Sequence, residues 1–237
     1  MAEDYYKERK LKEAMFYYHS LQRRGGRFHR LSKGTQDTIT DKIPAAVHTA
    51  ITTAIRQMIE LSLTSSNYIY PIKIDHKWSF EQREKEVRKV INRYKTTARL
   101  EGAGTGAGGI ILGMADFPLL LSIKMKCLFD IGRIYGFDVT AFSERVFLLQ
   151  IFSATFSSSE TRVKLWEEIR DWNKVTGAIE DVNWRVLQQE YRDHIDLIKM
   201  IQMLPGVGAF VGAIINGKFL EQLGTAAMHA YRIRMLT

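Results

Sequence analysis

Apolar side chains recur every three or four residues along most of the chain, which is the spacing of amphipathic helices. The pattern predicts a basic helix over residues 3–22 that ends at Gly25-Gly26, and a second helix from Pro44 toward Leu63. Residues 67–75 alone favour an extended segment. Further helices are predicted from residue 79 onward and over residues 117–135, 141–156, 161–172, 183–203 and 218–235. The sequence therefore predicts an all-α, multi-helix fold.

Two serines have the spacing of helix-capping residues. Ser79 is followed three positions later by Gln82, and Ser157 by Glu160. In a capping box the hydroxyl accepts a backbone N–H of the first turn, while the longer side chain reaches back to the serine N–H. These pairs predict where two helices begin.

Two glycine- and alanine-rich segments, Gly102–Gly113 and Gly206–Gly217, are the most unusual part of the sequence. Glycine costs about 0.8 to 1 kcal/mol relative to alanine inside a helix, so close packing must offset that loss. One explanation is two central helices that cross at short distance, and the other is insertion into a membrane or contact with a transmembrane partner. The candidate crossing or insertion residues are Gly104, Gly108, Gly109, Gly113, Pro118, Pro205, Gly208, Gly212 and Asn216.

Two other interpretations of these segments, a nucleotide-binding loop and a transmembrane helix, do not fit the sequence. The first resembles a nucleotide-binding loop, but no predicted strand precedes it and no Gly-Lys-Ser/Thr follows it. The run from Gly102 meets a carboxylate at Asp116, and the uncharged run 200–217 contains proline, glutamine and asparagine. We therefore expect neither to span a membrane.

Asp116 directly precedes Phe117-Pro118, which allows two interpretations. Asp116 can cap a helix that begins there, because proline needs no N–H donor in a first turn. Alternatively, it is a buried carboxylate that acts as a general acid or base.

Conventional catalytic and metal-binding signatures are absent from the sequence. It contains no Gly-x-Ser-x-Gly, no His-Glu-x-x-His and a single cysteine, Cys127, for which we expect a buried position. Glu190 and His194 have a spacing of four residues, but His194 continues an apolar ridge and fits a core histidine better than a ligand. We expect no metal and no cofactor. Asp116 and His194 remain the candidates for catalysis.

The chain carries a net charge of +8, most of it near the N-terminus. Residues 1–33 hold nine Lys or Arg against four acids, hence +5. Cations interleaved with aromatic rings suit an anionic membrane surface. The alternatives are nucleic acid, disfavoured because no nucleic-acid-binding motif is present, and a solvated basic face. The interleaved charges of residues 83–99, including Glu84, predict only such a solvated face. The membrane-binding candidates are Arg23, Arg24, Arg27, Phe28, Arg30 and Lys33.

Composition predicts one domain that spans residues 1–237, with the basic region 1–33 as its leading segment. The chain is 46% apolar and has four prolines, with no linker-like stretch between two halves. Its first residues are charged, unlike a secretory signal. One cysteine excludes an intramolecular disulfide and fits a reducing cytosol.

Three stretches together resemble the EcsC protein family: EGAGTGAGGIILGMADFPLLLSIKMKCLFDIGRIYGFD from Glu101, LPGVG from Leu204, and AAMHAYRIR near the C-terminus. Members of that family are encoded beside the ATPase and membrane subunits of an ABC transporter. The resemblance implies a cytoplasmic accessory protein, peripherally attached to the inner face of the membrane, with a transporter membrane subunit as a partner. The alternative is a hydrolase-like enzyme that acts on a lipid or peptide through Asp116.

Overall fold

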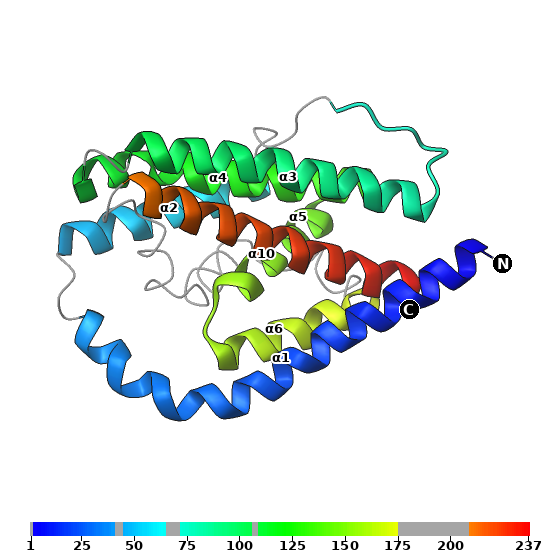
Figure 1. The fold of residues 1–237 in the computed structure, drawn as a ribbon, viewed down its shortest axis with the longest axis horizontal. Coiled ribbons are helices and arrows are strands. Elements are labelled where there is room, and N and C mark those ends of the chain that lie inside the picture. Colours follow the sequence, from blue (N-terminus) through cyan, green and yellow to red (C-terminus); the bar gives the residue numbers. More distant parts are fainter. Residues whose placement is uncertain (1, 41–44, 65–71, 106–108, 175–208) are drawn as a thin grey trace.

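The computed structural model describes residues 2–40, 45–64, 72–105, 109–174 and 209–237. Every regular element in these residues is a helix, which confirms the all-α prediction. Figure 1 shows α3 and α4 along one edge, α1 along the other, and α10 between them. The helices are α1 (Ala2–Thr40), α2 (Ala45–Thr64), α3 (Phe80–Thr105), α4 (Gly109–Tyr135), α5 (Phe142–Phe156), α6 (Ser159–Arg170) and α10 (Ala209–Leu236).

Helix α5 lies in the core and is buried on all sides. Apolar residues occur on every side of it, as expected of a helix that others surround, although Glu144, Arg145 and Gln150 are buried among them. Helices α2, α4, α6 and α10 pack against it. Phe147 of α5 contacts both Trp172 and Tyr231, at ring-centroid distances of 5.0 and 5.2 Å. Four apolar residues of the segment that follows α5 are buried as well: Leu165, Trp166, Ile169 and Trp172.

Helix α3 runs antiparallel to α10. Near one end Lys95 pairs with Glu221 at 2.5 Å, and toward the other end Glu84 pairs with Arg232 at 2.6 Å. The C-terminal part of α3 therefore lies beside the N-terminal part of α10. The described residues of both glycine-rich segments consequently approach the same end of the molecule (Figure 1).

Two glycines of α10 mark its closest approach to α3. A methyl group added at Gly217 would lie 2.6 Å from Nε of Arg99, and one added at Gly224 would lie 2.6 Å from Cγ1 of Ile91. Both distances are shorter than normal contacts between heavy atoms. Close helix packing at glycine is thus present, but Gly224 lies outside the segment that the sequence singled out.

We expect Gly224→Ala to destabilise the protein and Gly217→Ala to be tolerated. At Gly224 the added carbon meets a β-branched side chain, and such overpacking costs about 1 to 3 kcal/mol. At Gly217 it meets a flexible arginine that can move, while alanine gains about 1 kcal/mol of helix propensity. Urea denaturation measures both. Equal stability of the two variants would contradict tight packing at Gly224.

One of the two predicted capping boxes is confirmed. The backbone N–H of Ser79 donates to Gln82 Oε1 at 2.8 Å, and the N–H of Gln82 donates to Ser79 Oγ at 3.3 Å. The second prediction was wrong by one residue. Ser158 caps α6, accepting the N–H of Thr161 at 3.4 Å, whereas Ser157 ends α5.

Two predicted helix boundaries were also wrong. Helix α1 continues through Gly25-Gly26 to Thr40, because glycine weakens a helix without forbidding it and good helix formers flank the pair. Helix α4 begins at Gly109 and contains Pro118, so Asp116 lies inside it and does not cap its N-terminus. The proline removes one backbone N–H donor, a loss that burial of the surrounding apolar residues offsets. The predicted extended segment is not helical over residues 72–75, and residues 67–71 lie outside the described chain.

Candidate functional site

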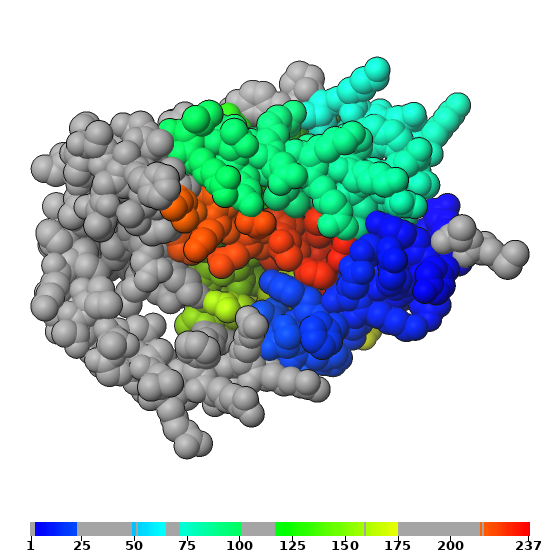
Figure 2. Space-filling model, in the orientation of Figure 1, coloured from blue at the N-terminus to red at the C-terminus, as the bar shows by residue number. Residues whose placement is uncertain are grey.

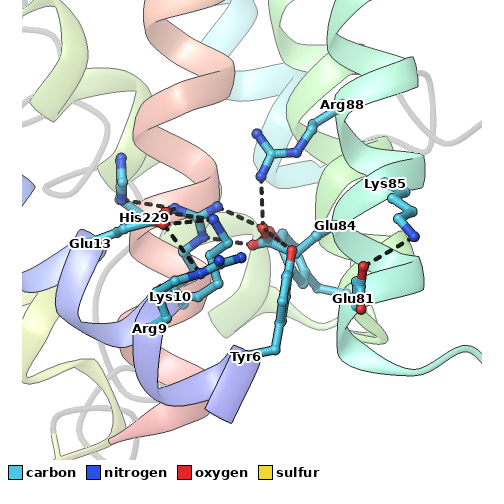
Figure 3. A network of polar contacts seen from close by, with 11 residues as sticks. Tyr6, Arg9, Lys10, Glu13, Glu81, Glu84, Lys85, Arg88 and His229 are labelled. Atoms are coloured by element: carbon cyan, nitrogen blue, oxygen red, sulfur yellow. Dashed lines mark hydrogen bonds and ion pairs between the residues drawn. The ribbon is translucent and has the colours of Figure 1, made fainter. Parts of the chain in front are cut away.

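A buried carboxylate on α3 is the centre of a network of polar contacts (Figure 3). Glu84 is fully buried, so the prediction of a solvated face was wrong at this position. Arg232 of α10 donates to it through Nε and Nη2, each at 2.6 Å. Tyr135 of α4 donates its hydroxyl at 3.0 Å. Glu84 therefore joins three helices through charge-assisted hydrogen bonds.

The same network attaches the first half of α1 to the core. Tyr6 donates to Glu84 at 3.5 Å, and Arg232 Nη1 donates to Glu13 Oε2 at 3.4 Å. Lys10, a buried lysine on α1, donates to both oxygens of Glu13, at 2.8 and 2.7 Å. These contacts fix the rotation of α1 about its own axis.

His229 lies beside this network and is neutral at pH 7. Its ring stacks on Tyr17 with centroids 4.3 Å apart and 12° between the planes. Burial, with the charge of Arg232 as a second cause, lowers the pKa of His229 to about 4. Its Nδ1 lies 3.4 Å from Arg232 Nη1 and accepts from that donor. The imidazole thus packs as an uncharged aromatic ring.

A second buried carboxylate, Glu144 of α5, is paired in a similar way. Tyr231 donates to one oxygen, and Arg234 donates to the other at 2.6 Å. The guanidinium of Arg234 also lies over the rings of Phe137 and Phe147, at 4.2 and 4.5 Å. Burial raises the pKa of Glu144, which Arg234 and Tyr231 partly counteract. Both buried carboxylates thus hold α10 to its neighbours.

Lys124 of α4 is fully buried among apolar side chains. Its Nζ lies 3.4 Å from Leu120 O and 3.4 Å from Asn216 Oδ1, and no described carboxylate pairs with it. Burial lowers its pKa to about 7. Asn216, predicted at a helix crossing, does connect α10 to α4 through this contact.

The structure describes the side chains of few of the other predicted site residues. Gly108, His194, Pro205 and Gly208 lie outside the described chain, as does Glu190. Cys127 is buried, as expected. The following lie within described helices, but their side chains or surroundings lie outside the described part: Arg23, Arg24, Arg27, Phe28, Arg30 and Lys33 in α1, Gly104 in α3, Gly109, Gly113 and Asp116 in α4, and Gly212 in α10.

The described surface has pockets lined partly by polar side chains. One of about 410 Å³ is lined by His76, Arg133 and Asp138 among others. Oδ1 of Asp138 accepts both the N–H and the hydroxyl of Thr140, at 2.9 and 2.6 Å, and these bonds lower its pKa. That carboxylate stabilises a turn and stays ionised. Within the described residues no three metal-binding side chains gather.

The buried network itself is suited to anchoring. Each carboxylate is paired with an arginine of α10 and accepts a hydrogen bond from a tyrosine, so that each connects helices far apart in the sequence. Arg232 lies in the AAMHAYRIR stretch, but nothing in the sequence gave it a role. Glu84 was predicted to lie on a solvated face, and no pattern singled out Lys124. None of the described helices is sufficiently long and apolar to traverse a bilayer.

Comparison with known proteins places this chain in a family. The EcsC protein family model matches residues 8–236. Protein EcsC of Bacillus subtilis (strain 168) is 45% identical over 226 residues, which cover 95% of this chain and 94% of that protein. Uncharacterized protein YdbA of the same organism is 30% identical over 158 residues, 64% of this chain and 57% of its own length. No solved structure matches the chain. The chain therefore belongs to the EcsC protein family.

Proposed function

We propose that this protein is a peripheral membrane-binding accessory protein, and that α1 attaches it to an anionic membrane surface. The observation that carries the proposal is the continuity of α1 from Ala2 to Thr40. A break at Gly25-Gly26 would leave the basic residues in a separate loop. In a continuous helix, the position of each basic residue around the helix axis follows from the orientation of the first half of α1.

Helix geometry then assigns faces to the positions of α1. At about 100° per residue, positions 23, 27 and 30 share one face, and positions 14, 18 and 21 lie on the opposite face. Ala14 and Tyr18 are buried in the core. Positions 23, 27 and 30 therefore continue the side of α1 that is opposite to the packed face of its first half. Positions 24 and 33 flank the basic face, whereas position 28 lies about 140° from position 23, so Phe28 does not share it.

The charge of this region supports an anionic partner. No acidic residue occurs between Glu13 and Asp37, while five cations occur there: Arg23, Arg24, Arg27, Arg30 and Lys33. A lysine or arginine near an anionic membrane surface contributes about 1 kcal/mol. Five such residues give useful affinity without a membrane-spanning helix.

The membrane in question is the inner face of the cell membrane, and the partner is an ABC transporter membrane subunit. Both follow from the resemblance of this chain to a family encoded beside such transporters. Anionic lipid on the cytoplasmic leaflet is the surface that a basic helix would meet there.

We expect Arg23, Arg24, Arg27 and Arg30 together, each changed to Gln, to weaken binding to vesicles that contain phosphatidylglycerol. At about 1 kcal/mol per cation, the loss is on the order of 100- to 1,000-fold, and added salt should reproduce part of it. Flotation with and without phosphatidylglycerol measures this. The control removes four exposed lysines elsewhere: Lys73, Lys77, Lys85 and Lys89. Equal loss in both variants, or binding unchanged in the first, would contradict the proposal.

A further inference from the structure

Two large aromatic side chains on α1 are left exposed by the fold. Tyr5 is 70% and Phe16 73% exposed, the highest values among the large hydrophobic side chains of the described residues. They are eleven residues apart, so they lie on nearly the same side of the helix, about 16 Å apart along its axis. Figure 2 shows the N-terminal half of α1, in blue, at the surface of the molecule.

Exposed cations lie between and beside these rings. The side chains of Arg9 and Lys12 are 53% and 76% exposed, and His19 is exposed as well. Lys12 pairs with Glu8 at 2.7 Å, and Arg9 lies 3.9 Å from Glu13. Both acids lie at the borders of this face, about 60° to 80° from Phe16. The face itself alternates rings and cations.

The same face continues into the basic half of α1. Positions 5, 9, 12, 16 and 19 follow one another at intervals of three or four residues, and positions 23, 27 and 30 extend the series. We call these eight positions the outer stripe of α1. It holds two aromatic residues, one histidine, five residues with permanent positive charge and no acid: Tyr5, Arg9, Lys12, Phe16, His19, Arg23, Arg27 and Arg30.

The buried network keeps the described part of this stripe away from the core. Arg232 contacts Glu13, Tyr6 reaches Glu84, and Arg170 donates to the hydroxyl of Tyr18 at 2.9 Å. The Tyr18 contact is on the packed side of α1, and the Glu13 and Tyr6 contacts lie at the borders between the packed and the exposed sides. Rotation of the helix that would bury Phe16 would break them.

We propose that the outer stripe of α1 lies in the plane of an anionic bilayer and that the rings of Tyr5 and Phe16 enter its interface, an inference that rests on the proposed membrane attachment. Interfacial helices combine cations that meet lipid phosphates with rings at the boundary of the acyl region. A helical protein partner fits less well, because a helix–helix seam needs apolar residues at most of its positions. Here cations occupy most of the stripe.

The test places an environment-sensitive fluorophore at Phe16→Cys. Cys127 is fully buried and its thiol pKa is raised by burial, so it does not compete for the label under native conditions. With vesicles of phosphatidylcholine and phosphatidylglycerol, we expect a blue shift and a several-fold rise in emission. Leu100→Cys is the matched control, because Leu100 is 69% exposed on α3, along the opposite edge from α1 in Figure 1.

A second measurement uses unlabelled protein. Tyr5→Ser with Phe16→Ser should fold normally, since both rings are exposed, and should bind the same vesicles roughly 5- to 100-fold more weakly. Flotation that persists with unchanged emission at Phe16→Cys would overturn the interfacial placement and leave the attachment intact. Equal emission changes at Phe16→Cys and Leu100→Cys would also overturn it. Failure of the parent protein to float would overturn both proposals.

Discussion

Lys124→Met should raise the free energy of unfolding at pH 7 by about 3 to 4 kcal/mol. Lys124 is fully buried and its pKa is lowered to about 7, against 10.5 for the free side chain. Near neutral pH the unfolded chain therefore holds this proton more firmly than the folded protein does. Each unit of difference corresponds to about 1.4 kcal/mol. Methionine has a similar length and is not ionised, so it removes this cost and gives up only two long hydrogen bonds.

The pH dependence of stability has a definite sign. The folded pKa lies below the unfolded one, so the cost is complete below about pH 7 and disappears as the pH rises toward 10.5. Within that window the parent should gain stability relative to Lys124→Met by about 1.4 kcal/mol per pH unit. Urea denaturation from pH 6 to pH 10 measures the difference.

An exposed lysine provides the control for this measurement. Lys89→Met alters a side chain that is 72% exposed and pairs with Glu86 in its own helix, so stability should change by less than about 0.5 kcal/mol. A difference between parent and Lys124→Met that stays constant from pH 6 to pH 10 would show that Lys124 is accessible to water.

The position of Lys124 could have been predicted from the sequence. Its neighbours three and four positions away are Leu120, Leu121, Cys127 and Leu128, so it occupies an apolar helix face. Glu84 gave the opposite signal. Arg88 follows it by four residues, the usual spacing of an ion pair on a solvated surface, and that pair does form at 3.2 Å. Glu84 is buried by contacts with helices that lie far from it in the sequence, namely α1, α4 and α10.

The apolar pattern predicted that the chain is helical and roughly where its helices lie, but it did not predict where α1 ends or where α4 begins. Gly25-Gly26 and Pro118 are strong local breaking signals, yet α1 and α4 continue through them. Local propensity at one or two residues is worth a few kcal/mol, which good helix formers around the glycine pair offset in α1 and burial of apolar residues offsets in α4. The candidate membrane-binding face depends on this outcome, because the outer stripe of α1 exists only if the helix is continuous.

Arg232→Met should destabilise the protein by about 3 to 5 kcal/mol, because it leaves Glu84 charged and buried without its main partner. The removal of one member of a buried ion pair has this cost. Of the partners of Glu84, only Tyr135 and the partly exposed Arg88 and Tyr6 would remain. Arg88→Met should cost at most about 1 kcal/mol, since that guanidinium is 51% exposed.

Neutralisation of Glu84 distinguishes loss of packing from an uncompensated charge. Alone, Glu84→Gln weakens two short hydrogen bonds and should destabilise the protein. In the Arg232→Met background the same change removes the stranded charge, while the amide still accepts from Tyr135, so it should restore part of the lost stability. A double-mutant cycle in urea measures the coupling between the two positions. Glu84→Gln could instead destabilise the protein equally in the parent and in the Arg232→Met background. In that case the cost of Arg232→Met arises from lost packing, and the uncompensated charge of Glu84 does not contribute to it.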